Sequence, residues 1–146
     1  MSAGGRTGKA TLRIGNSLAE LEKVALWVEA FGAEKGVPRT AVNDLNLSLD
    51  EILNNTVSYG YSDQDDHEIM VNIWLAGDFL IAEVQDDGMP YDPRQQTVAS
   101  LSGGVRERQP GGLGVHFVKA LMDEIGYARI GNYNKLTLKR KIPDGG

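Results

Sequence analysis

The sequence contains no cysteine. This absence excludes disulfides and thiolate-ligated zinc sites, and it is consistent with a reducing compartment, so we expect a cytoplasmic protein. Lysine and arginine total 15 against 20 aspartate and glutamate residues, and the resulting net charge of −5 argues against direct nucleic-acid binding. The apolar runs fall far short of the roughly 20 residues that a membrane-spanning helix needs, so no membrane association is expected.

The composition is that of one globular domain. The 146 residues can bury a single hydrophobic core, and a content of 41% hydrophobic and 24% charged residues is typical of globular proteins. Residues 1–9 are rich in glycine and lack the apolar stretch of a signal peptide, so we expect a flexible leader there. We expect the folded domain over residues 10–142 and a short tail over residues 143–146.

Three amphipathic helices are predicted from apolar residues that recur at three- and four-residue steps. The first is capped by Asn16 or Ser17 and continues to about Gly36. The second covers residues 38–60, with a proline where a helix can begin, and the third covers residues 113–125.

Five strands are predicted from short apolar stretches bounded by turn residues. Gly77-Asp78 forms the turn between the second and third strands, and residues 132–134 separate the last two. The element order β-α-α-β-β-loop-α-β-β is typical of an α+β two-layer sandwich, with helices on one face of a mixed, mostly antiparallel sheet. The five strands are residues 10–14, 68–76, 79–86, 127–131 and 135–142.

One side of the second helix carries an unusual set of polar residues. At 100° per residue the apolar positions form one stripe, while Glu51 and Asn55 lie nearly opposite it and one turn apart. An amide oxygen can ligate Mg²⁺, and a neighbouring carboxylate can orient or deprotonate an attacking hydroxyl or water. A solvated polar face is the alternative, although Leu47 on the same side indicates that something covers it. The stripe comprises Val42, Leu45, Leu49, Ile52 and Leu53, and the polar side also carries Asp44, Ser48 and Ser58.

The third predicted strand ends in Asp86-Asp87-Gly88. A carboxylate at a strand end can accept a hydrogen bond from an exocyclic amine such as that of adenine, and glycine would let the backbone approach the ring. An acidic turn that merely ends the strand is the alternative.

Residues 87–112 hold three of the five prolines and several glycines but few apolar residues. A stretch of this length without clear elements is usually functional or mobile. At its end, glycines 111, 112 and 114 precede and open a helix, where bare N–H groups and the helix N-terminus can bind phosphate. A flexible hinge explains these glycines equally well.

The three patterns, in this order, resemble the N, G1 and G2 boxes of the GHKL ATPase superfamily, which includes gyrase, Hsp90, histidine kinases and MutL. The phrases DEILNNTVSYGY, DDGMPYDP and GGLGVHFVKALMDEIGYARIGNYNKLTLKRK are most similar to the small anti-sigma factor serine/threonine kinases of the RsbW and SpoIIAB type. The resemblance covers roughly residues 10–142 and implies the Bergerat (GHKL) ATP-binding fold, a histidine-kinase-like ATPase domain.

The resemblance also implies a role for each matching residue. Glu51 would be the catalytic base and Asn55 the Mg²⁺ ligand, while Asp86 would bind adenine with Gly88 beside it. Tyr59 departs from the family, which often has histidine at this position. Residues 92–110 would form the ATP lid, Arg106 and Arg108 are candidates to reach the γ-phosphate unless they are solvated loop charges, and the expected phosphate-binding residues are Gly111, Gly112, Leu113 and Gly114.

The implied function is that of an ATP- and Mg²⁺-dependent serine/threonine protein kinase. Its expected partners are an anti-anti-sigma (STAS) protein, which it would phosphorylate, a sigma factor, which it would sequester, and a second copy of the chain. A nucleotide-gated binding module without kinase activity needs the same boxes and is the alternative. The ATP-binding half of a histidine kinase would need a phosphoacceptor histidine on a preceding helix, yet the only histidines are His67 and His116.

Overall fold

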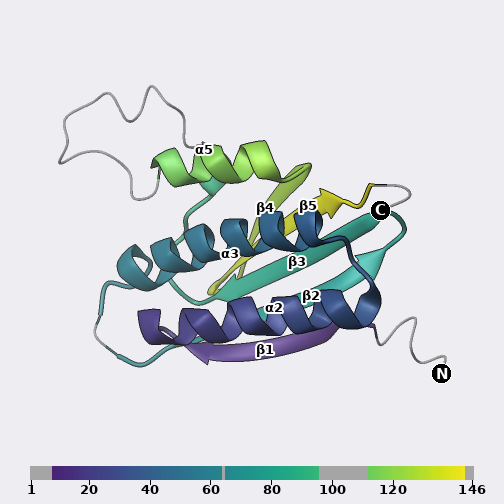
Figure 1. Cartoon of the computed structure of the whole chain (residues 1–146). Coiled ribbons are helices and arrows are strands. Elements are labelled where there is room, and N and C mark those ends of the chain that lie inside the picture. The colour runs from purple at the N-terminus through teal and green to yellow at the C-terminus, as the bar shows by residue number, and fades with distance from the viewer. Residues whose placement is uncertain (1–7, 64, 96–111, 144–146) are drawn as a thin grey trace.

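The computed structural model describes residues 8–63, 65–95 and 112–143, and its elements follow the predicted order with two short 3₁₀ helices added (Figure 1). In this described part, no helix is both long and apolar enough to cross a bilayer. The elements are β1 (Ala10–Gly15), η1 (Leu18–Glu20), α2 (Leu21–Lys35), α3 (Arg39–Tyr59), β2 (Glu68–Ala76), β3 (Phe79–Asp86), η2 (Pro93–Gln95), α5 (Gly112–Leu121), β4 (Glu124–Ile130) and β5 (Tyr133–Lys141).

The strands form one sheet in the order β1-β2-β3-β5-β4, and every neighbouring pair is antiparallel. Helices α2, α3 and α5 lie on the same face of this sheet (Figure 1). The predicted two-layer α+β arrangement is therefore confirmed. The described strands include no parallel pair of neighbours, so the sheet is antiparallel throughout and lacks the mixed character that was expected.

Two details of the C-terminal prediction are wrong. Helix α5 ends at Leu121 rather than at residue 125, because the chain turns there and the Asp123 N–H donates to Lys139 O (2.8 Å), so that Ile125 packs on the core from β4. The last hairpin turns at Gly131, which has a φ of 59° at the first central position, as type II′ turns require. Asn134, predicted as a turn residue, consequently lies in β5.

The short helix η1 continues directly into α2, and suitable capping residues lie at the start of η1 and at the end of α2. The Ser17 hydroxyl accepts a hydrogen bond from the Ala19 N–H (3.2 Å), so Ser17, of the two predicted candidates, is the cap, and the helix it caps is η1. At the other end Gly36 adopts a left-handed φ of 71°, and the Val37 N–H donates to Gly32 O (2.9 Å). These contacts satisfy groups that a helix end leaves unpaired.

The hydrophobic core lies between the helices and the sheet. The predicted stripe of α3 is buried, with Leu45 completely inaccessible to solvent. Burial of one such leucine side chain contributes about 1.5–3 kcal/mol. The largest fully buried core side chains are Val28, Leu45, Leu49, Leu53, Ile69, Val71, Ile73, Leu80, Val84, Val118 and Leu138.

The polar side of α3 is partly covered, because α5 packs against α3 on the side away from α2 (Figure 1). Ser48 is fully buried, and its hydroxyl donates to Asp44 O (2.9 Å). The Asp44 carboxylate accepts hydrogen bonds from Arg140 of β5 (2.9 Å). The expected position of Ser48 opposite the buried stripe is therefore wrong. Leu47 is 50% exposed, so the described residues of this chain cover it only in part.

This difference between neighbouring leucines predicts different effects on stability. Leu45→Ala leaves a cavity in the core, so we expect it to lower the free energy of unfolding by about 2–5 kcal/mol. Leu47→Ala removes an exposed side chain from the same helix, so its effect should stay within about 0.5 kcal/mol. Urea unfolding of both variants measures these values, and equal losses would contradict the assigned orientation of α3.

Candidate functional site

A cavity of about 310 Å³ opens between α3, the end of β3, the segment that follows it and the β4–β5 hairpin. A cavity of this size with a mainly apolar wall and a few polar groups is typical of small-molecule sites. Asn55 and Asp86, the predicted Mg²⁺ and adenine ligands, both line it although they are far apart in the sequence. The other polar or aromatic lining residues are Thr56, Tyr59, Tyr91, Tyr127 and Asn134, and the apolar wall includes Ile52, Val84, Met89 and Leu136.

Asp86 places a buried carboxylate at the edge of this cavity. Its side chain is only 7% exposed, and its Oδ1 accepts hydrogen bonds from the Gly88 N–H (2.8 Å) and from Asn134 Nδ2 (3.0 Å). Burial raises the pKa of Asp86, and these two hydrogen bonds partly oppose that rise. Among the described residues, none donates to Oδ2, so this oxygen can accept a hydrogen bond from a ligand.

Gly88 lies where only glycine can be accommodated. A Cβ atom at this position would lie 2.5 Å from Gly60 O and 2.9 Å from Asp86 Oδ1. The close approach lets the Met89 N–H donate to Gly60 O at the C-terminal end of α3 (2.7 Å). The glycine therefore joins the Asp86 turn to the helix that carries Glu51 and Asn55.

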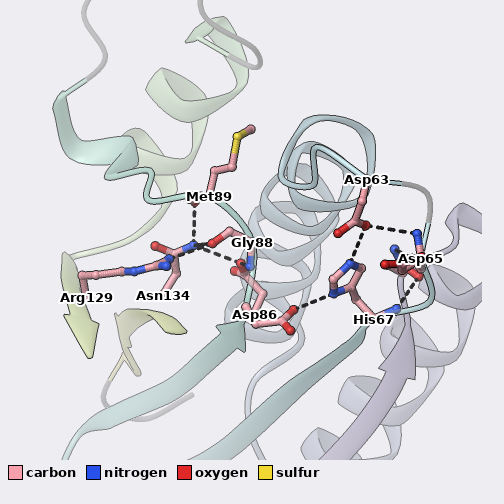
Figure 2. A network of polar contacts seen from close by, with 10 residues as sticks. Asp63, Asp65, His67, Asp86, Gly88, Met89, Arg129 and Asn134 are labelled. Carbon is pink, nitrogen blue, oxygen red and sulfur yellow. Dashed lines mark hydrogen bonds and ion pairs between the residues drawn. The ribbon is translucent and has the colours of Figure 1, made fainter. Parts of the chain in front are cut away.

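Asn134 is the site residue that sequence reasoning missed. It lies directly opposite Asp86 in the β3–β5 pairing, is 6% exposed, and donates through Nδ2 to Asp86 and to Met89 O (2.8 Å) (Figure 2). Its Oδ1 accepts a hydrogen bond from the Tyr127 hydroxyl. Arg129 of β4 adds a hydrogen bond to Gly88 O (2.7 Å). The only signal was an asparagine close to a strand, which was interpreted as a turn.

Glu51 and Asn55 lie side by side, as residues one helical turn apart should. Asn55 Nδ2 donates to Glu51 Oε2 (3.1 Å), which leaves the amide oxygen of Asn55 available to a ligand. Burial, followed by the charges of Glu51 and Asp92, raises the pKa of the Tyr91 hydroxyl to about 12. Glu51 is therefore close to the loop that follows β3.

The oxygen atoms available at the cavity fit a metal ion that is bound jointly by the protein and by the phosphates of a ligand. Among the described residues there is no cluster of three or more His, Cys, Asp or Glu side chains that could hold a metal ion. Mg²⁺ in phosphate-transfer sites commonly binds one or two protein oxygens together with substrate phosphates. The free amide oxygen of Asn55 at the cavity wall is suited to such a site.

The remaining predicted residues divide between the described and the undescribed parts of the chain. Gly112, Leu113 and Gly114 form the first turn of α5. Of the predicted lid at 92–110, the structure describes residues 92–95, where Arg94 pairs with Asp92 (2.7 Å). Arg106, Arg108 and Gly111 lie outside the described residues.

Comparison with known proteins gives relatives of one kind. Residues 14–140 match the family model described as histidine kinase-like ATPase domain. The serine/threonine-protein kinase BtrW of Bordetella bronchiseptica is 31% identical over 94 residues, which cover 64% of this chain and 66% of that protein. The serine-protein kinase RsbW of Listeria monocytogenes is 28% identical over 104 residues, covering 68% of this chain and 66% of that protein. The chain thus spans slightly less than two thirds of the length of these two relatives.

Two further matches extend over more of the chain. The serine-protein kinase RsbW of Bacillus subtilis is 25% identical over 119 residues, which cover 79% of this chain and 72% of that protein. A crystal structure of RsbU and RsbW domains from Mycobacterium tuberculosis is similar in fold, with a TM-score of 0.65 and 20% identity, over 91% of this chain and 32% of that one. Because the family model matches most of its residues, the chain belongs to the histidine kinase-like ATPase domain family.

Proposed function

We propose that the chain is an ATP-binding serine/threonine protein kinase that phosphorylates an anti-anti-sigma (STAS) protein and sequesters a sigma factor. The observation that carries this proposal is the presence of Asp86 and Asn55 in the wall of one cavity, with Glu51 hydrogen-bonded to Asn55. The relatives at 25–31% identity are serine or serine/threonine kinases, which supports the same activity. A homodimer is part of the proposal by the same resemblance.

The cavity supports the binding of an adenine ring. Its apolar wall can enclose the ring, and Asp86 Oδ2 can accept a hydrogen bond from the exocyclic amine, since Oδ1 already accepts two hydrogen bonds. A buried carboxylate that is held in place discriminates well, because a ligand without the donor would leave it unpaired. Asn134 keeps Asp86 in this orientation.

The other end of the site supports phosphoryl transfer. The Asn55 amide oxygen would hold Mg²⁺ together with the phosphates, and the bound ion would neutralise phosphate charge. Glu51, which is hydrogen-bonded to Asn55, would orient the incoming hydroxyl and accept its proton. The N–H groups of the first turn of α5 would bind the phosphates, and the expected contributions of Arg106, Arg108 and Gly111 stay predictions.

Asn55→Ala tests the Mg²⁺ ligand. It removes the amide oxygen, so we expect the Mg²⁺-dependent part of ATP affinity to fall on the order of tenfold. Isothermal titration of ATP with and without Mg²⁺ measures the change. Asn54→Ala is the matched control, because Asn54 is the neighbouring asparagine and is not among the residues that line the cavity in the described part of the chain. Equal effects of both changes would reject the assignment of Asn55.

Glu51→Gln separates binding from catalysis. Loss of a general base lowers the rate of proton transfer by about 10²–10⁴-fold. ATP binding should persist, because Glu51 is not among the described residues that line the proposed adenine cavity. The measurement is transfer of the radiolabelled γ-phosphate to an anti-anti-sigma protein, followed over time. Unimpaired transfer by the variant would remove Glu51 from the mechanism. ATP binding and complex formation by the unsubstituted protein without any phosphorylated partner would favour the nucleotide-gated binding module.

A further inference from the structure

His67 lies beside the proposed nucleotide site and contacts two carboxylates at once. Its Nε2 is 2.7 Å from Asp63 Oδ1, and its Nδ1 is 3.0 Å from Asp87 Oδ1. Figure 2 shows the imidazole between Asp63 and the end of β3, with the Asp86–Asn134 contacts on the other side of the same turn. The side chain is 15% exposed, so the ring is largely shielded from solvent.

The position of the ring is determined by three separate segments. The His67 N–H donates to Asn16 Oδ1 (3.1 Å), and the Asn16 N–H donates back to His67 O (3.1 Å), which ties the residue to the end of β1. Tyr61 stacks on the imidazole with ring centroids 4.2 Å apart and an interplanar angle of 19°. These contacts hold the ring still, so its two nitrogens point at Asp63 and Asp87.

The chemistry of imidazole makes this arrangement dependent on a proton. A neutral imidazole has one N–H and one acceptor nitrogen, whereas the imidazolium ion has two donors. Only the charged ring can donate to both carboxylates. The charged groups that face it are Asp63 and Asp87; Tyr61 contributes its ring face, and Asn16 contacts only the main chain.

We propose that His67 is a positioning residue of the nucleotide site: its imidazolium form tethers Asp87, and loss of the proton releases the Asp86-Asp87-Gly88 turn and weakens nucleotide binding. The inference rests on the proposed function, because it requires that the cavity binds ATP. It adds to that function a regulation of nucleotide affinity by His67, which is not among the described residues that line the cavity.

The tether acts on the turn from the side that Asn134 does not reach. Asn134 and Arg129 contact Asp86, Gly88 O and Met89 O from the β4–β5 hairpin. His67 contacts Asp87 from the opposite side of the turn. When the ring becomes neutral, the shorter contact with Asp63 keeps the remaining N–H, and Asp87 then faces an unprotonated nitrogen.

The pH range follows from the direction of the shift. The hydrogen bond with Asp63 raises the pKa of His67 above its ordinary value of 6.5, the charge of Asp87 acts in the same direction, and burial opposes both. A raised folded-state pKa means that the tether is complete below pH 6.5 and is lost as pH rises through the folded pKa of His67. Nucleotide affinity should therefore decrease over that range.

The test compares ATP affinity of the unsubstituted chain and His67→Gln from about pH 5.5 to about pH 9. Taking the ratio of the two dissociation constants at each pH cancels the titration of ATP itself and of His116. We expect the unsubstituted chain to bind roughly fivefold more tightly at the acidic end, with the ratio approaching one at the basic end. A ratio that is constant with pH overturns the proposal.

A second variant moves the transition instead of removing it. Asp63→Asn takes away the largest cause of the raised pKa of His67, so the pH at which the affinity ratio falls should move downward. Glu68→Gln is the matched control, because it neutralises the next residue of the chain, whose ion pair is with Arg13 (3.4 Å). A transition that moves equally in both variants overturns the proposal.

An NMR titration tests the His67 tether separately from the proposed ATP binding. With only two histidines, the imidazole NMR signal that is absent from His67→Gln belongs to His67, and its titration without nucleotide gives the pKa directly. A raised pKa that falls in Asp63→Asn supports the tether, and an ordinary pKa overturns it. Absence of ATP binding at every pH would instead overturn the proposed function, and the inference with it.

Discussion

The candidate site depends on one cross-strand pair, Asp86 of β3 and Asn134 of β5. A carboxylate that is 7% exposed is costly unless donors satisfy it, and the β3–β5 register supplies the donor by placing the two residues opposite each other. The same amide group also donates to Met89 O, so one side chain fixes both the carboxylate and the loop beyond it. A one-residue slip would turn Asn134 to the other face of the sheet and leave Asp86 unpaired.

Helix α3 carries two tasks on different sides. Its apolar stripe supplies Leu45 and Leu49 to the core, while Glu51 and Asn55 contact each other outside that stripe and Asn55 lines the cavity. Because the stripe is fully buried, the helix cannot rotate without exposing apolar surface. The core therefore sets the direction in which the polar pair points, which explains how Asn55, a mediocre helix former, is retained at this position.

Sequence patterns predicted the local features well and the non-local ones poorly. The bounds of β2 and β3 agree with the prediction, and the contact of Glu51 with Asn55 follows from helical periodicity alone. Asn134 was missed because its role comes from pairing with a residue far away in the chain, and a hairpin misplaced by a few residues hides that pairing. The predicted end of α5 was wrong for the same reason, because β4 begins where its residues can pair with β5. The contacts of His67 needed three segments to be placed together, which no local pattern records.

The absence of a side chain at residue 88 has a consequence for the whole molecule. Because Gly88 lets the Met89 N–H reach Gly60 O, the turn that carries Asp86 and the end of α3 are joined by a single main-chain hydrogen bond. This hydrogen bond fixes the main chain of the Asp86 turn relative to the C-terminal end of α3, the helix that carries Asn55. In the proposed site, the walls that carry the adenine-binding Asp86 and the Mg²⁺-binding Asn55 are therefore linked through the main chain and not only through side chains.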